Sequence, residues 1–163
     1  EREGVECSRY LIFNYAQGSW VTGFYTRTAY ADAGVFPFPL SADSGGGVYF
    51  QEKDFSNDGA ARSTFLETSY FMLGDGETFA RVMGVRPDFD DLQGGLSITF
   101  YSRDYPQGPE RTYGPYMITG ATNRLSVRIT GRQIKFKIET DDAPSFYRLG
   151  KMTFDVQESG QKR

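Results

Sequence analysis

The chain has 163 residues, which is enough for one full hydrophobic core, or for one domain and part of another. Its net charge of -3 argues against binding of a phosphate backbone as its main role. Its 0 histidines remove the commonest ligand of zinc, copper and non-haem iron. The 14 Phe, 11 Tyr and 19 Gly are typical of many short strands joined by tight turns, so the composition predicts an all-β fold.

The first residues carry few signals. Glu1 in place of Met indicates a fragment or a processed chain, and nothing near it resembles a signal peptide. Cys7 is the single cysteine and has no partner for an internal disulfide. No apolar run approaches the roughly 20 residues that a helix needs to cross a bilayer, so we expect no membrane anchor.

Residues 9–26 predict a β-hairpin. An apolar run at Tyr10–Tyr15 is followed by a turn at residues 16–18 and by a second run at Ser19–Thr26. Trp20 is the large apolar residue of the second run. Two strands joined by so short a turn are expected to pair antiparallel.

A long connection and a glycine-rich loop follow. Thr28–Leu40 passes through Pro37 and Pro39 and is expected to be a long connection that has room for short extended pieces. The glycine-rich loop after it leads into a strand at Gly47–Glu52. Pairs of short strands with turns about 10 residues apart are typical of a β-propeller blade. We therefore expect blade-like hairpins over residues 1–58, the end of an incomplete propeller whose neighbouring blades lie outside this chain or in another copy.

Residues 59–158 are expected to form an antiparallel β-sandwich, and residues 159–163 a flexible tail. The turn-rich segments between the strands, among them Pro87–Gly95, are expected to be connections. Frequent short strands with regular turns favour a sandwich. We predict seven strands: Ser63–Phe71, Thr78–Arg86, Gly95–Tyr101, Tyr113–Thr119, Arg124–Thr130, Gln133–Thr140 and Phe146–Val156.

The clearest strand signal is Gln133–Glu139. Its apolar residues Ile134, Phe136 and Ile138 alternate with polar residues, and successive side chains of a strand point to opposite faces. One face of this strand is therefore expected to lie in a core and the other in water. No segment of the chain shows a convincing helical period.

Asp43-Ser44-Gly45-Gly46 has the same residues as the loop that carries the nucleophilic serine of trypsin-like proteases. A serine hydroxyl needs a positioned base, and the chain has 0 histidines, no Ser-x-x-Lys on a helix and no Gly-x-Ser-x-Gly. The Asp-Ser-Gly of aspartic proteases needs two facing copies, and one is present. We expect a glycine-rich loop here. The enzymatic alternative is a hydrolase that works through paired carboxylates or through an Asp43-Ser44 site in an obligate dimer.

Asp88, Asp90 and Asp91 raise the question of a calcium site, because hard cations bind several oxygen ligands at loop spacing. The order of an EF-hand and its terminal glutamate are missing, so a solvated turn is expected. Gly74–Glu77 has no lysine and does not match a phosphate loop. We expect no catalytic residue, no metal and no cofactor.

Tyrosines and basic residues of the second half are the candidate contact residues. Tyr101, Tyr105, Tyr113 and Tyr116 would suit stacking on sugar rings if they were exposed in a row. The spacing of four basic residues predicts that several share the polar face of one hairpin, where they would meet an acidic neighbouring subunit or only solvent. These four are Arg124, Arg128, Arg132 and Lys135. The candidate interface comprises Arg124, Arg128, Arg132, Tyr113 and Tyr116.

A set of motifs carries a resemblance to a known family. They are Tyr105-Pro106-Gln107-Gly108-Pro109, Gly114-Pro115-Tyr116, Val127-Arg128, Gly131-Arg132-Gln133 and Arg148-Leu149-Gly150, and upstream Arg9-Tyr10 to Trp20 and Arg27-Thr28-Ala29. Through them the chain resembles, over nearly its whole length, the tail-nozzle or packaged-DNA-stabilisation proteins. These are virion components at the head-to-tail junction of short-tailed bacteriophages. The motifs are structural rather than catalytic.

The resemblance implies a propeller body followed by a β-sandwich, of which this chain lacks most of the propeller. It implies a structural virion protein, not an enzyme, that is assembled in the bacterial host cytoplasm and located in the virion tail. Its partners would be further copies of the chain, in a ring around the DNA channel, and other phage tail proteins. The ring would retain and conduct packaged DNA without binding it specifically. The alternative is a carbohydrate-binding β-sandwich module of a tail or cell-wall protein.

Overall fold

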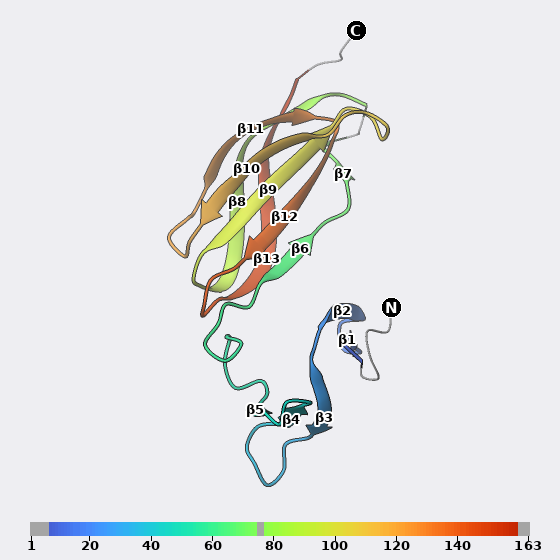
Figure 1. The fold of residues 1–163 in the computed structure, drawn as a ribbon. Helices are drawn as coiled ribbons and strands as arrows, with labels where there is room; N and C mark the ends of the chain where they lie inside the picture. The colour runs from blue at the N-terminus through green and yellow to red at the C-terminus, as the bar shows by residue number, and fades with distance from the viewer. Residues whose placement is uncertain (1–6, 75–76, 160–163) are drawn as a thin grey trace. The chain divides into compact units, whose positions relative to one another are not determined.

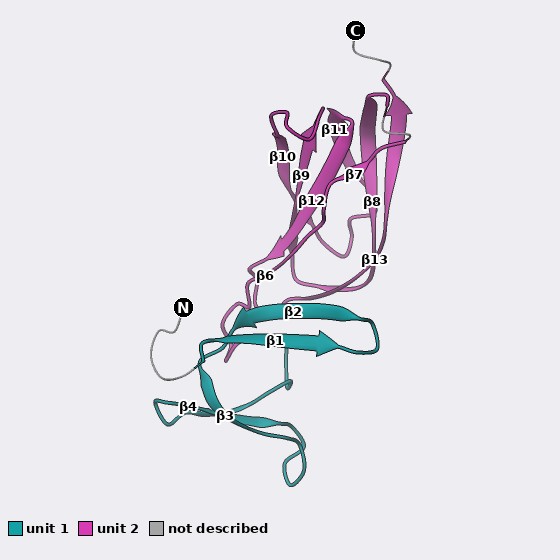
Figure 2. Ribbon diagram, turned by 90° about the vertical axis from the view of Figure 1, so that its right-hand side faces the viewer, with its two compact units in different colours: residues 1–54 teal, residues 55–163 magenta. Residues whose placement is uncertain are grey.

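A computed structural model describes residues 7–74 and 77–159, which form two compact units, Glu1–Asp54 and Phe55–Arg163 (Figure 2). These described residues contain no helix, and their strands pair antiparallel in four separate sheets. The prediction of an all-β fold is therefore confirmed. No helix that is long and apolar enough to span a membrane occurs in the described part of the chain. Residues 160–163 of the predicted tail lie outside it.

The predicted hairpin at the start of the first unit is confirmed. Strands β1 (Arg9–Asn14) and β2 (Ser19–Phe24) pair antiparallel, with Phe13 opposite Trp20. Their turn ends at Gly18, whose φ of 65° lies in the left-handed region that glycine tolerates best. The Asn14 side chain accepts hydrogen bonds from two backbone N–H groups of this turn. Local chemistry thus explains the hairpin.

A second sheet of the first unit has the order β3-β4-β5, from β3 (Arg27–Ala31), β4 (Leu40–Asp43) and β5 (Val48–Phe50). The predicted strand at residues 47–52 is thus present in its central part. In the predicted connection from residue 28 to residue 40, the extended piece is the end of β3, which reaches Ala31 and pairs with β4. The glycine-rich loop is the turn between β4 and β5 (Figure 1).

The described residues of the second unit form eight strands in two sheets (Figure 1). The five-stranded sheet has the order β10-β9-β12-β6, with β7 also paired to β12, and the three-stranded sheet has the order β11-β8-β13. The strands are β6 (Thr64–Glu67), β7 (Phe71–Met72), β8 (Ala80–Gln93), β9 (Leu96–Arg103), β10 (Arg111–Ile118), β11 (Leu125–Gly131), β12 (Gln133–Thr140) and β13 (Phe146–Glu158).

Both sheets contribute to one hydrophobic core. In β12, Ile134, Phe136 and Ile138 are buried as their alternation predicts. Phe100 of β9 is fully buried, and its ring centroid lies 6.4 Å from that of Phe154 on β13, in the other sheet. Aromatic rings at this separation stabilise the packing beyond the area that they bury. The unit therefore contains its own core.

One predicted connection, Pro87–Gly95, is wrong. Strand β8 continues through Pro87 as far as Gln93, and this half of it pairs with β13. A proline inside a strand lacks an N–H, but it is tolerated at an edge. The register of β8 with β11 ends at Val85, so Pro87 has a neighbouring strand on one side only. The turn to β9 begins at Gly94, with a φ of 79°.

Candidate functional site: an arginine-bearing sheet face

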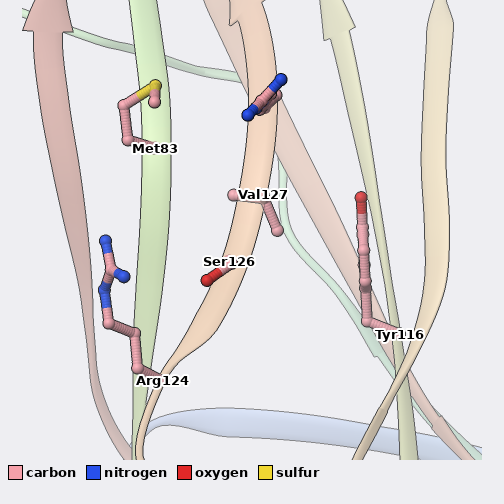
Figure 3. Close-up of a pocket in the computed structure, with 6 residues that line it drawn as sticks. Met83, Tyr116, Arg124, Ser126 and Val127 are labelled. Atoms are coloured by element: carbon pink, nitrogen blue, oxygen red, sulfur yellow. The ribbon is translucent and has the colours of Figure 1, made fainter.

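Tyr116, Arg124 and Arg128, three of the predicted interface residues, line one open hollow of the second unit. Figure 3 shows Tyr116 on the far side of this hollow from Met83 and Arg124. Tyr116 belongs to β10, whereas the other lining residues belong to β8 and β11 or directly precede β11. Because β10 and β11 are edge strands of different sheets, the hollow lies between two sheet edges.

Arg124 lies flat against the three-stranded sheet. Its Nε is 3.1 Å from Oδ2 of Asp155, and Arg86 reaches the other oxygen of the same carboxylate at 3.4 Å. A Cβ on Gly84 would lie 2.5 Å from the guanidinium of Arg124. A glycine at this position of β8 therefore leaves the space in which the arginine lies.

Arg128 is directed to solvent by an irregularity in β11. The register of β11 with β8 shifts between Ser126 and Ile129, so Val127 and Arg128 together lie opposite Met83. Val127 is buried in the core, whereas Arg128 is exposed. Within the described residues, Arg128 forms no ion pair and no side-chain hydrogen bond.

Arg81 of β8 adds a fourth guanidinium on this strand pair. It is exposed, and among the described residues it too has no ion pair. The outer side of the first half of β8 and of β11 thus bears four arginines, and Asp155 of the neighbouring β13 is the carboxylate that two of them share. We call this group the arginine face; it comprises Arg81, Arg86, Arg124 and Arg128. Guanidinium groups have the geometry for bidentate hydrogen bonds to carboxylate or phosphate oxygens.

The remaining predicted interface residues do not join the arginine face. Tyr113 is half-buried and packs against the core. Arg132 follows β11, and its guanidinium lies 5.3 Å from the ring centroid of Tyr105. The prediction that these basic residues share one hairpin is wrong, because β11 and β12 belong to different sheets. Lys135 of β12 is consequently separated from Arg124 and Arg128.

Lys135 belongs to a closed network on the five-stranded sheet. Its Nζ lies 2.9 Å from a carboxylate oxygen of Glu67 and 3.4 Å from one of Glu110. Its Nζ is also 4.6 Å from the ring centroid of Tyr101 and 5.3 Å from that of Tyr70. The cation is therefore paired on several sides, and the network stabilises the sheet rather than offering a free group.

Tyr70 donates a hydrogen bond to the carboxylate of Glu110 in the same network. Burial, followed by this hydrogen bond, raises the pKa of Tyr70 to about 12. The same bond is the main cause that lowers the pKa of Glu110. Sequence reasoning missed this pair because the two residues are 40 positions apart, and neither lies in a motif.

Asp43 holds the glycine-rich loop. Its carboxylate accepts hydrogen bonds from the N–H groups of Gly45 and Gly47, at 2.9 and 2.8 Å, and from the hydroxyl of Tyr49. Arg27 lies 3.5 Å away as an ion-pair partner. The N–H group of Gly47 is the main cause that lowers the pKa of Asp43. Ser44 is exposed beside it.

The acidic cluster lies on a strand, not in the predicted turn. Asp88, Asp90 and Asp91 are exposed on β8, and Asp90 pairs with Arg148 at 3.1 Å. Extended backbone separates their carboxylates, whereas a calcium loop wraps around its ion. No group of three or more histidine, cysteine or acidic side chains that would hold a metal ion occurs in the part of the chain that the structure describes.

The four candidate sugar-binding tyrosines do not form one exposed row. Tyr113 and Tyr116 are half-buried and pack against the core. Tyr101 lies beneath Lys135, and only Tyr105 of the four is exposed. A planar stacking platform built from these side chains is therefore absent.

No protein-family model matches the chain, and no curated protein matches it. The described residues thus define an all-β protein with an arginine-bearing sheet face in its second unit.

Proposed function

We propose that the chain is a structural, non-catalytic component of the tail of a short-tailed bacteriophage. In this proposal it forms part of a ring around the DNA channel that retains and conducts packaged DNA. Residues 7–54 supply the last strands of a propeller, and the second unit is an antiparallel β-sandwich. The proposal rests on the sequence resemblance and on one structural observation in the first unit.

The carrying observation is that the β1–β2 hairpin exposes apolar side chains on both faces. On one face, Leu11, Trp20 and Phe24 are 62%, 61% and 77% exposed. On the other, Ile12 and Val21 lie opposite each other and are 54% and 53% exposed. Among residues 7–54, Ser41 is the one buried residue. Exposed apolar surface of this extent on a two-stranded ribbon favours coverage by further protein.

Further blades of a propeller are the covering layers that this geometry suits best. A blade packs against neighbours on both faces, so its strands are apolar on both sides. A lone sheet with one wet face would instead alternate apolar and polar residues, as β12 does. The hairpin therefore has the pattern of an inner layer.

The second unit supports a structural role for a different reason. Its two sheets enclose a core whose buried residues range from Leu73 to Ile138. On the five-stranded sheet, Lys135 and Lys137 are paired with carboxylates of the same sheet. The chain as a whole is acidic, with a net charge of -3, which suits a channel component that does not hold DNA. This charge balance supports the proposal that DNA passes without specific binding.

Mass spectrometry of purified virions tests the proposal directly. In particles of the phage whose genome encodes this sequence, we expect peptides of the chain in every preparation, in stoichiometric amounts. A deletion of the gene should yield filled heads that lose their DNA during purification. Absence of the chain from particles, or full DNA retention in the deletion particles, would falsify the proposed function.

A further inference from the structure

Strand β8 carries opposite charges in its two halves. Arg81 and Arg86 are exposed in the first half, and Asp88, Asp90 and Asp91 are exposed in the second. Arg86, Asp88 and Asp90 occupy alternate positions, separated by buried Pro87 and by Phe89, which packs against the core. They therefore lie on one outer side of the three-stranded sheet.

The arginine half has more positive charge than its own sheet neutralises. Asp155 of β13 pairs with both Arg86 and Arg124, so one carboxylate serves two guanidinium groups. Arg81 and Arg128 have no ion-pair partner among the described residues. At least two guanidinium groups on this face are thus available to carboxylates from outside the unit.

The opposite half has an excess of acidic groups. Besides Asp88, Asp90 and Asp91 of β8, the connection between β12 and β13 brings Asp141 and Asp142 to this end. The carboxylate of Asp142 accepts a hydrogen bond from the N–H of Gly95 at 2.9 Å, next to the β8–β9 turn. Arg148 and Lys151 of β13 are the nearby cations, and Arg148 pairs with Asp90. We call this group of five aspartates the acidic end.

Arg86 and Asp88 meet in the middle of β8, two positions or about 7 Å apart, so the two halves neutralise each other there but not at their far ends. Arg81 and Asp90 are nine positions apart on β8, which corresponds to about 30 Å of extended strand. Ions in physiological salt screen charges over about 8 Å. The charges at the far ends of β8 therefore act independently unless a second molecule brings them together.

We propose that the arginine face of one copy binds the acidic end of the next copy. Such a contact joins two different surfaces of the same protein, so it repeats head to tail and closes into a ring when the rotation between copies allows. This inference rests on the proposed ring and adds the surfaces that hold its subunits together. Electrostatic complementarity of this kind sets register and partner choice.

A second copy suits the arginine face better than nucleic acid does. The acidic end is a complementary surface of the same chain and is present at equal concentration. The net charge of -3 opposes the approach of a polyanion to the molecule as a whole. Phosphate binding is nevertheless a distinct outcome that the experiment below detects.

Complementary charge reversal tests the inference on the full chain. One variant carries Arg81→Glu with Arg128→Glu, and the other carries Asp88→Lys with Asp91→Lys. All four side chains are exposed and form no ion pair within the described residues, so the changes should leave folding intact. A matched control carries Lys53→Glu with Arg62→Glu, exposed residues outside both surfaces. Analytical ultracentrifugation at low salt measures the association of each.

We expect the wild type and the control to associate, and each charge-reversal variant to associate at least about tenfold more weakly. An equimolar mixture of the two variants should regain the wild-type association, because each altered surface then meets its complement. A monomeric wild type, unchanged association of either variant, or a mixture that stays dissociated would overturn the inference.

Fluorescence anisotropy with a labelled DNA duplex, at the same salt concentration, tests whether the arginine face binds DNA phosphates instead of a second copy. One outcome is that the wild type binds DNA, and that the variant with Arg81→Glu and Arg128→Glu loses DNA binding without any loss of self-association. That result would mean that the arginine face binds phosphates, and the inference would be wrong. The virion experiment above is independent of this result. A chain found in virions whose charge variants assemble normally would retain the proposed function and lose the proposed contact.

Discussion

Asp43 organises its loop with one carboxylate. Two backbone N–H groups, one tyrosine hydroxyl and one guanidinium converge on it. The same side chain would be the acid partner in a protease-like interpretation of Asp43-Ser44. Its geometry instead matches an aspartate that closes a turn by accepting hydrogen bonds from the following backbone.

Removal of the Asp43 carboxylate should release the loop. In Asp43→Ala we expect faster hydrogen exchange at the amides of Gly45 and Gly47, measured by NMR as protection factors. Asp43→Asn keeps one acceptor oxygen and should give an intermediate result. Unchanged protection of both amides in Asp43→Ala would show that the carboxylate does not hold them.

The same carboxylate predicts a pH dependence with a definite sign. The N–H group of Gly47, the hydroxyl of Tyr49, the N–H group of Gly45 and Arg27 lower the pKa of Asp43 below 3.8 against a smaller opposing effect of burial. The unfolded chain therefore takes up a proton before the folded loop does, and stability falls as pH falls. Protection of Gly47 should be complete above about pH 4 and lost at lower pH, as the folded carboxylate titrates. Asp43→Asn should remove this dependence.

Tyr70 should lose its proton at a higher pH than an ordinary tyrosine, and its hydrogen bond to Glu110 is one of the causes. Burial and the hydrogen bond to Glu110 raise the pKa of Tyr70 to about 12. The unfolded chain releases this proton near pH 10, so stability falls as pH rises between 10 and 12. Ultraviolet titration should show one tyrosinate signal near pH 12 that Tyr70→Phe removes. Glu110→Gln should move that signal toward pH 10, and a titration indifferent to Glu110→Gln would contradict this account.

At the scale of single elements, β9 and β12 link the two sheets through aromatic residues. The ring centroid of Phe100 lies 6.1 Å from that of Tyr116, 6.3 Å from that of Phe136 and 6.4 Å from that of Phe154. Phe154 belongs to the three-stranded sheet and the other two to the five-stranded sheet. Phe100 is therefore a central contact of the core.

Truncation of Phe100 should strongly destabilise the second unit. Phe100→Ala leaves a cavity at a fully buried position, and such changes reduce the free energy of unfolding by about 3–5 kcal/mol. Phe65→Ala changes an exposed phenylalanine of the same sheet and should cost less than about 1 kcal/mol. Urea unfolding monitored by near-ultraviolet circular dichroism measures both. Equal losses for the two variants would disprove the central position of Phe100.

At the scale of the whole molecule, burial is distributed very unevenly. The core residues extend from Leu73 to Ile138 and belong to the second unit. The first unit has paired strands but leaves its large apolar side chains exposed. Hydrophobic burial is the dominant favourable contribution to folding, so the two units should differ in stability.

Hydrogen exchange measured by mass spectrometry should reveal this difference. In the isolated chain we expect strong protection in β9 and β12 and weak protection in β1 and β2, because a lone hairpin is only marginally stable. In virions the amides of β1 and β2 should become protected. Equal protection of β1, β2 and β9 in the isolated chain would contradict the proposal that the first unit needs a covering layer.

Sequence patterns predicted those strands whose formation depends only on residues that are close together in the sequence. Alternation identified β12, and a short turn between two apolar runs identified β1 and β2. The pattern failed at Pro87, because proline signals a break but an open strand side tolerates it. It also missed the Tyr70–Glu110 pair, whose members meet only after the sheet forms.

The sequence by itself determined the all-β class, most strand positions and the absence of a histidine-based site, since these depend on composition and on spacing along one strand. Only the tertiary structure decided which charges share a surface. It placed β11 and β12 in different sheets, which separated Lys135 from Arg124 and Arg128 and brought these two arginines beside Arg81 and Arg86. The reason is that strand pairing and core burial bring together residues that are distant in sequence, and the spacing of residues along the chain does not show which strands will pair.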